Sequence, residues 1–241
     1  MMTPDFMLRF SALLVGLIVV GSIVCLPLYK WKLRAFFASS LFLKTIWWVP
    51  IFIVLVAILY GGVAVAIVVT LFIMLAATVE FIRNRGYRSN VAVAYFILFL
   101  FLMAHLGLWF VYLPGSAMVL ATVCVISVLS DVTAFFLGNY AGNHKLPRWI
   151  NNRKSWEGVL GQLIGAGIGA LLCWWILQTT VPILVVASIG IASALGDIVN
   201  SIAKRSLNIK DWGKTIPGHG GMLDRMSSLS AALAVSLWLL I

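Results

Sequence analysis

Residues 181–225 read VPILVVASIGIASALGDIVNSIAKRSLNIKDWGKTIPGHGGMLDR, and the architecture of the chain can be argued from them. As far as about residue 201 the stretch is mainly apolar, and an apolar run of ~20 residues is long enough to cross a bilayer as an α-helix. The remainder is dense in charge and glycine and holds five of the 17 Lys and Arg residues. The stretch therefore predicts a membrane helix that ends in a polar, basic loop at the membrane surface.

The whole chain has the composition of a membrane protein. Of its 241 residues, 63% are hydrophobic and only 10% are charged, with a formal net charge of +10. A soluble domain could not cover that much apolar surface. We therefore expect one integral membrane domain over 1–241, with N-terminal helices in 1–113 and the polar motifs in 114–241. The three cysteines lie in apolar runs without metal-binding or disulfide spacing.

Eight apolar runs predict an all-α, polytopic membrane helix bundle. They cover 9–28, 45–60, 62–80, 91–113, 117–137, 159–177, 181–201 and 227–241. The first run lacks a strongly basic leader and a clear cleavage site, so we expect a span and not a signal peptide. Basic residues other than Arg9 all fall on four alternate loops: 29–45, 82–90, 138–158 and 202–226. Because basic loops stay in the cytosol, both termini are expected outside, in a multi-pass protein of the bacterial cell membrane.

Two aspartates, Asp131 and Asp197, fall inside predicted spans near their cytosolic ends. An ionised side chain at the bilayer centre costs about 2.5–3.5 kcal/mol, so such residues normally face a polar cavity, a partner or an ion. We expect Asp197 to bind a ligand, the alternative being an internal ion pair with Lys204 or Arg205. For Asp131 a structural role is nearly as strong an alternative, because its neighbours are mostly apolar.

The predicted helix of Asp197 carries a polar stripe. Asn200, Ser201, Lys204 and Asn208 follow Asp197 at spacings that place them on one face of a helix. A polar stripe that descends from a basic loop predicts a half-open cleft that faces the cytosol.

Carboxylates near this cleft predict a magnesium site. Mg²⁺ prefers oxygen ligands and is commonly held by one or two carboxylates together with substrate phosphates. The candidate ligands are Asp131, Asp197 and Asp224. Zinc is not expected, because the three histidines are scattered and no cysteine accompanies them.

The polar loop also offers groups that could bind phosphate. Its basic candidates are Lys204, Arg205, Lys210 and Arg225. Gly220 and Gly221 can expose backbone N–H groups, and His219 can donate a hydrogen bond, although a tight turn after Pro217 is an alternative reason for the glycines. Lys154, in the preceding basic loop, is explained equally well by membrane topology and by phosphate binding.

These motifs resemble those of the phosphatidate cytidylyltransferases, or CDP-diacylglycerol synthases. The signature reads Ser201-x-x-Lys204-Arg205-x4-Lys210-Asp211, followed by Ile216-Pro217-Gly218-His219-Gly220-Gly221-x-x-Asp224-Arg225. Similar upstream elements are Ser130-Asp131, Gly138, Gly142, His144-Lys145-Leu146, Lys154-Ser155-Trp156-Glu157-Gly158 and Leu195-Gly196-Asp197. The resemblance runs over 130–228, and before it only hydropathy agrees. The family pattern continues Asp-Arg-x-Asp, whereas this chain has Ser227 at the last position.

The resemblance implies an enzyme that converts CTP and phosphatidate into CDP-diacylglycerol and pyrophosphate with Mg²⁺. It implies catalytic roles for Asp197, Asp224, Lys204 and Arg225, with Asp197 and Asp224 at the metal, where Asp131 is a further candidate from its place inside a predicted span. Substrate-binding positions are Lys154, Ser201, Lys204, Arg205, Lys210, Asp211, His219, Gly220, Gly221 and Arg225. It also implies contact with bilayer lipid and a homodimer, and no partner is expected among nucleic acids.

Two alternatives remain open on the sequence. An anionic-solute transporter would explain intramembrane acids and basic loops, but it would place polar residues further toward the far side of the bilayer. A catalytically weak or inactive relative that binds nucleotide or lipid is suggested by Ser227, because a hydroxyl is a weaker metal ligand than a carboxylate.

Overall fold

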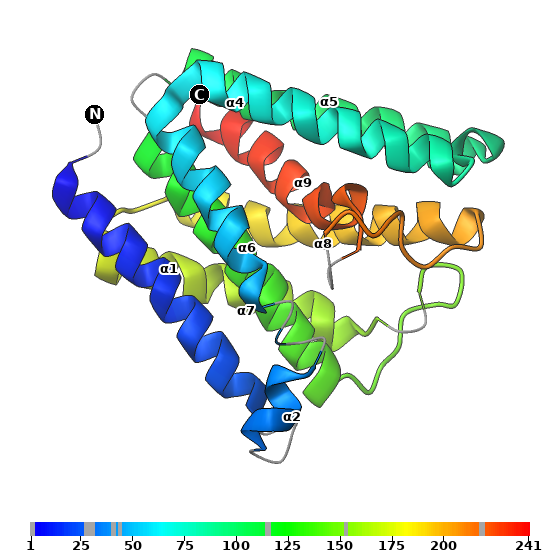
Figure 1. Cartoon of the computed structure of the whole chain (residues 1–241), viewed down its shortest axis with the longest axis horizontal. Helices are drawn as coiled ribbons and strands as arrows, with labels where there is room; N and C mark the ends of the chain where they lie inside the picture. The colour runs from blue at the N-terminus through cyan, green and yellow to red at the C-terminus, as the bar shows by residue number, and fades with distance from the viewer. Residues whose placement is uncertain are drawn as a thin grey trace.

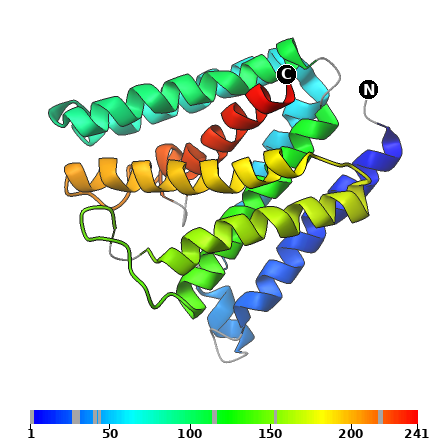
Figure 2. The same ribbon diagram turned by 180° about the vertical axis from the view of Figure 1, so that it is seen from behind.

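The computed structural model describes residues 3–26, 32–39, 42, 45–113, 117–151, 154–216 and 220–241. Over these residues the chain forms helices and no strand, so the predicted all-α class is confirmed (Figures 1 and 2). The long helices are α1 (Pro4–Cys25), α4 (Trp48–Arg83), α5 (Asn90–Tyr112), α6 (Ala117–Tyr140), α7 (Trp156–Leu172), α8 (Ile183–Ser206) and α9 (Met222–Leu240). The short ones are α2 (Leu33–Phe37), the 3₁₀ turn η2 (Gly86–Arg88) and η3 (Cys173–Leu177), a π-helical turn that extends α7.

Seven helices in the described part are long and apolar enough to cross a membrane, where the sequence predicts eight spans. The difference lies in α4, because this one helix contains most of the predicted span 45–60 and all of the predicted span 62–80. Gly62 interrupts it with φ 60° and ψ −145°, a conformation that L-residues with a side chain rarely adopt. The ribbon turns sharply there, so two helical segments run in different directions (Figure 1). The two runs predicted as separate spans, 45–60 and 62–80, are therefore separated by a break in the helix.

Hydroxyl side chains mark the beginnings of three helices. Thr3, Ser89 and Ser155 precede α1, α5 and α7, and each side chain accepts a hydrogen bond from a backbone N–H in the first turn. The helix α9 begins at Met222 and not at 227 as predicted. Asp224 and Arg225 therefore lie in its first turn and not in the loop before it.

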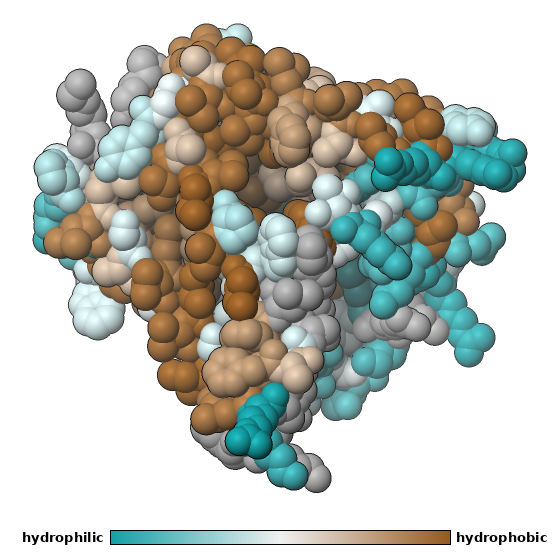
Figure 3. All heavy atoms as spheres, viewed as in Figure 1, coloured by the Kyte–Doolittle hydropathy of each residue, from teal (hydrophilic) through white to brown (hydrophobic). Residues whose placement is uncertain are grey.

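The charged loops lie at one end of the bundle. Hydrophilic side chains gather on the side where α4 and α8 end and α5 begins, while apolar side chains cover much of the remaining face (Figure 3). Both chain ends lie at the opposite end (Figure 1). Placing the two termini together agrees with the predicted topology, and the apolar helices make the chain an integral membrane protein.

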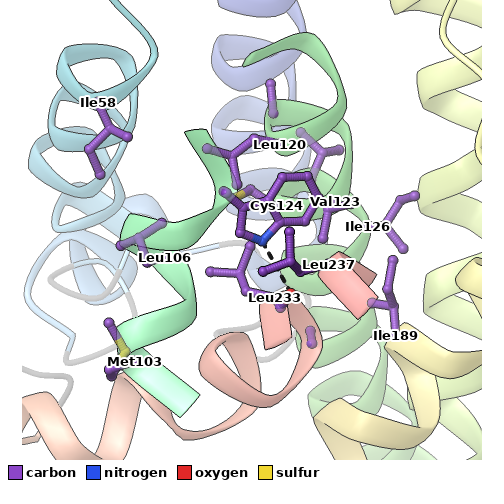
Figure 4. Packing of buried hydrophobic residues seen from close by; sticks show 14 of the residues in the cluster. Ile58, Met103, Leu106, Leu120, Val123, Cys124, Ile126, Ile189, Leu233 and Leu237 are labelled. Atoms are coloured by element: carbon purple, nitrogen blue, oxygen red, sulfur yellow. Dashed lines mark hydrogen bonds between the residues drawn. The ribbon is translucent and has the colours of Figure 1, made fainter. Parts of the chain in front are cut away.

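Close helix packing and a buried α9 hold residues 117–241 together over the part that the structure describes. On α7, Gly165 and Gly169 face α6 so tightly that a Cβ would meet the Leu129 carbonyl oxygen at 2.4 Å and the Ile126 Cα at 2.8 Å. On the other side, the Trp109 indole of α5 donates to the Leu233 carbonyl of α9 at 3.1 Å (Figure 4). The helix α9 is thereby surrounded by neighbours, which fixes its first turn relative to α8.

Candidate active site

Asp197 forms an ion pair that joins α8 to the loop before α7. Lys154 Nζ lies 2.9 Å from Asp197 Oδ2 and donates to the Asp197 backbone oxygen at 3.0 Å. The hydroxyl of Ser201 donates to that same backbone oxygen at 2.9 Å. The two charged side chains are 29% and 36% exposed, so the pair stays open to solutes. Asp197 thus pairs with Lys154, and neither Lys204 nor Arg205 forms the ion pair that the structural alternative predicted.

Asp224 is held more tightly, at the beginning of α9. Its Oδ1 lies 2.6 Å from Lys204 Nζ, and its Oδ2 accepts from the backbone N–H groups of Trp212 at 2.8 Å and Gly221 at 3.0 Å. The carboxylate is only 3% exposed, and the lysine side chain 14%. Asp224 therefore caps its own helix and fixes the loop before it, while Lys204 covers its remaining oxygen.

Ser227 lies between the two acids. Its hydroxyl is 3.4 Å from Asp197 Oδ1 and 3.5 Å from the Asp224 backbone oxygen. The Asn200 side chain donates to it at 3.3 Å and accepts from the Trp212 indole at 2.8 Å. The position where the family has its last aspartate is therefore in contact with the predicted site. The structure brings Asp197, Asp224, Lys154 and Lys204 together around it.

Asp131 lies on α6 and faces two other helices. Its Oδ2 accepts from the Ser228 hydroxyl of α9 at 2.5 Å, and its Oδ1 accepts from the Gln162 amide of α7 at 3.2 Å. These bonds satisfy both carboxylate oxygens at the junction of three helices.

The oxygen donors fit Mg²⁺ in their chemistry. Asp197 and Asp224 offer carboxylates and Ser227 a hydroxyl, all hard ligands, and a cationic Nζ already lies against each carboxylate. Among the residues described, no group of three or more His, Cys, Asp or Glu side chains is close enough to hold one metal. The predicted trio with Asp131 is therefore not gathered here, and water and substrate phosphate would have to complete the coordination.

The other residues predicted for the site follow Asp197 on α8, lie in the loop after it or begin α9. Arg205 donates to the Ile209 carbonyl at 3.0 Å just beyond the end of α8. Lys210, Asp211 and Arg225 are exposed. Gly220 has φ +91°, and its carbonyl accepts from the Ile216 N–H at 2.9 Å. The N–H of Gly221 is already used by Asp224. His219 and Pro217 lie outside the described residues.

The sequence analysis missed Glu80. This acid lies in the last turn of α4 with only 4% of its surface exposed, and it accepts hydrogen bonds from the first turn of α9. The signal was present, because an acid within an apolar run is a site candidate by the reasoning applied to Asp197.

A cavity of about 230 Å³ opens beside the site between α1, the beginning of α4 and α6. Its walls are mainly apolar, with Leu17, Phe52 and Phe135 among them, whereas Asp131 and Arg225 also line it. The cavity therefore joins an apolar, lipid-exposed region to charged groups near the site.

Comparisons with known proteins agree with these features. A model of the cytidylyltransferase family matches residues 6–241. The phosphatidate cytidylyltransferase of Mycobacterium tuberculosis (strain ATCC 25618 / H37Rv) is 31% identical over 161 residues, covering 65% of this chain and 48% of that protein. The corresponding protein of Haemophilus influenzae is 41% identical over 113 residues, covering 43% and 39%. The uncharacterized protein YnbB of Escherichia coli (strain K12) is 32% identical over 141 residues, covering 55% and 47%.

The chain spans about half the length, or less, of these curated relatives. Neither the family match nor the named relatives support a transporter or an inactive relative. The family match extends over nearly every described helix, including those that carry Asp197 and Asp224. The chain therefore belongs to the cytidylyltransferase family.

Proposed function

We propose that this protein transfers the cytidylyl group of CTP to phosphatidate, forming CDP-diacylglycerol and releasing pyrophosphate. The observation that carries the proposal is the pairing of Asp197 with Lys154 and of Asp224 with Lys204 on neighbouring helices, at 2.9 and 2.6 Å. Family membership and the names of the relatives support the same reaction.

The proposed reaction requires little acid–base catalysis by the protein. An ionised oxygen of the lipid phosphate attacks the α-phosphorus of CTP, and the bond from that phosphorus to the oxygen bridging to the β-phosphate breaks. Because the attacking oxygen is already ionised near neutral pH, no strong general base is required. Catalysis then depends on positioning the two phosphates and stabilising the charge that moves onto pyrophosphate.

Asp197 and Asp224 would hold Mg²⁺, with Ser227 between them. When bound, the ion would supply positive charge to the triphosphate oxygens. Asp131 we assign to the junction beside the apolar cavity, where it accepts from Ser228, the neighbour of Ser227 on α9.

Two lysines of the chain would supply positive charge to the phosphates of CTP. Lys154 and Lys204 each donate to a carboxylate, and both would exchange that partner for phosphate oxygens of CTP. Arg225, Lys210 and Arg205 surround the same end of α8 and α9 and would extend the positive surface. Asp211 and Gly220 would shape the entrance, while the buried Ser201 would hold the backbone of Asp197.

The cavity lined by Asp131 and Arg225 suits the lipid substrate. Its apolar walls would receive part of an acyl chain, while the Arg225 guanidinium would face the lipid phosphate. The basic loops would lie in the cytosol, where CTP is available, and the diacylglycerol would stay in the bilayer.

The test uses purified protein in detergent micelles with labelled CTP and phosphatidate. We expect label in the lipid fraction and release of pyrophosphate, both requiring phosphatidate and Mg²⁺. Asp197→Asn should lower the rate about 10²–10³-fold, the range typical for loss of one charge-stabilising group.

Asp5→Asn is the matched control, because Asp5 forms an exposed pair with Arg9 on α1 at 3.0 Å and should leave the rate unchanged. Failure of the natural protein to release pyrophosphate in a lipid-dependent manner would refute the proposed function. An undiminished rate in Asp197→Asn would refute the role of that residue.

A further inference from the structure

Glu80 is a buried acid at the polar end of an apolar helix. It lies four residues before Asn84, the C-cap residue of α4, and 4% of its surface is exposed. A carboxylate that leaves water is costly unless hydrogen bonds compensate it. Its partners therefore show what the residue does.

Those partners belong to the loop and helix that carry Asp224. Glu80 Oε1 accepts from the Met222 N–H at 2.8 Å, and Oε2 accepts from the Leu223 N–H at 3.1 Å. The hydroxyl of Thr215 also donates to Oε1. One side chain of α4 thus ties the loop after α8 to the first turn of α9.

Glycines allow this approach. A Cβ at Gly221 would lie 2.5 Å from Glu80 Oε2, and one at Gly213 would lie 2.8 Å from Oε1. A Cβ at either position would displace the Glu80 carboxylate, which fills the space in which a side chain would begin. This close packing gives two glycines of the loop a role that does not involve phosphate.

A second residue of α4 continues the contact. Asn84 donates to the Trp212 carbonyl and also to the Glu80 carbonyl, the latter at 2.8 Å. The Trp212 N–H in turn donates to Asp224 Oδ2 at 2.8 Å. Asn84 therefore holds the loop at Trp212, and Glu80 holds the first turn of α9 at Met222 and Leu223. The Trp212 N–H between these contacts fixes the Asp224 carboxylate.

From these contacts we infer that Glu80 is a positioning residue of the site: it fixes the loop residues 212–216 against the first turn of α9, and thereby holds the Asp224 carboxylate toward Lys204. The consequence for nucleotide binding rests on the proposed function, whereas the positioning does not.

The same arrangement directs substrate phosphate away from the N-terminus of α9. Free N–H groups at a helix N-terminus attract anions. Here the N–H of Gly221 donates to Asp224, and those of Met222 and Leu223 donate to Glu80. Two built-in carboxylates occupy this end of the helix, so an incoming triphosphate would bind the cationic side chains instead.

Hydrogen–deuterium exchange of the whole purified protein tests the positioning directly. Glu80→Gln keeps the shape but places an NH₂ group against one of the backbone donors, so amides of 212–225 should exchange about tenfold faster or more. Thr78→Ala is the matched control on α4, because the Thr78 hydroxyl donates within its own helix to Met74 O at 2.7 Å. Its exchange should match the natural protein over 212–225.

Thr215→Ala removes a single donor to Glu80 and should give a smaller local increase in amide exchange. This variant allows the test to be made even if Glu80 variants do not fold. Unchanged exchange over 212–225 in Glu80→Gln would overturn the inference. So would an increase of equal size in α5 and α6, because that pattern would mark general loss of stability.

Affinity for Mg²⁺·CTP, measured by calorimetry, tests the consequence. Glu80→Gln should weaken binding about tenfold, because Asp224 loses its fixed position, while Thr78→Ala should not. If the natural protein binds no CTP, the proposed function fails, and the exchange experiment still decides the role of Glu80. If exchange rises locally while affinity is unchanged, the positioning role of Glu80 stands and its consequence for nucleotide binding is overturned.

Discussion

The hydroxyl of Ser227 contacts the Asp197 carboxylate and the backbone oxygen of Asp224, and the charge at that position should set how strongly the site binds a divalent cation. Ser227 Oγ is 3.4 Å from Asp197 Oδ1. Ser227→Asp would add a third carboxylate there. We expect the Mg²⁺ concentration for half-maximal CDP-diacylglycerol formation to fall about tenfold, the lower end of effects seen for groups around metal ligands.

Ser227→Asn is the neutral control and should not increase the apparent affinity for Mg²⁺. In the absence of Mg²⁺, Ser227→Asp should unfold at lower temperature than Ser227→Asn, because its new charge faces that of Asp197. An unchanged Mg²⁺ requirement would place this position outside the metal site. Activity found only in Ser227→Asp would identify the natural chain as an inactive relative.

The sequence allowed the residues of the site to be predicted, but it was a poorer guide to the ion pairs between them. Helical spacing placed Lys204 on the face of Asp197, yet seven residues at ~1.5 Å each separate them along the axis. Lys154 reaches Asp197 from 43 positions away, through a loop fold that no periodicity encodes. The role of Glu80 was missed for a similar reason, because its partners lie more than 130 residues further along the chain.

At the scale of the helix, α1 forms one wall of the apolar cavity and so offers a way to test lipid binding alone. Gly21 lines the cavity, and a Cβ there would meet nothing within 4 Å. Gly21→Phe should fill this space and raise KM for phosphatidate several-fold, about what 1–2 kcal/mol of lost apolar burial would give. KM for CTP should not change.

Gly16→Phe is the matched control on the same helix. Gly16 also has open space around it but does not line the cavity. Equal kinetics for the two variants would show that the acyl chain does not use this cavity.

Helix positions were predicted well where hydropathy changes abruptly and poorly where polar residues continue a helix. The break at Gly62 coincides with the predicted boundary between the apolar runs 45–60 and 62–80. The start of α9 was placed five residues late, because Asp224 and Arg225 were read as loop residues. An acid in the first turn is in fact favourable, since it accepts from the free N–H groups of the helix.

For the whole molecule, the distribution of basic loops predicts an orientation that labelling can test. Lys145 and Thr180 are exposed and lie beyond opposite ends of α7 and its extension η3. That helical stretch spans roughly 33 Å at ~1.5 Å per residue, enough to cross a bilayer. In intact bacteria, a membrane-impermeant maleimide should label Thr180→Cys and leave Lys145→Cys unlabelled.

Permeabilised cells, in which both positions should react, provide the control. The three natural cysteines are buried, so the background should be low. The reverse pattern would mean that the basic loops face outward and that CTP could not reach the site from the cytosol.

The contact between Glu80 and α9 also has a consequence for how the protein is made. Met222 follows Glu80 by 142 residues, so α4 enters the membrane long before its hydrogen-bond donors have been translated. Until then the carboxylate must remain at the water boundary, where the end of α4 places it. The arrival of α9 supplies those donors, and the arrangement that holds the Asp224 carboxylate is therefore a late product of biogenesis that no earlier, partly inserted chain can possess.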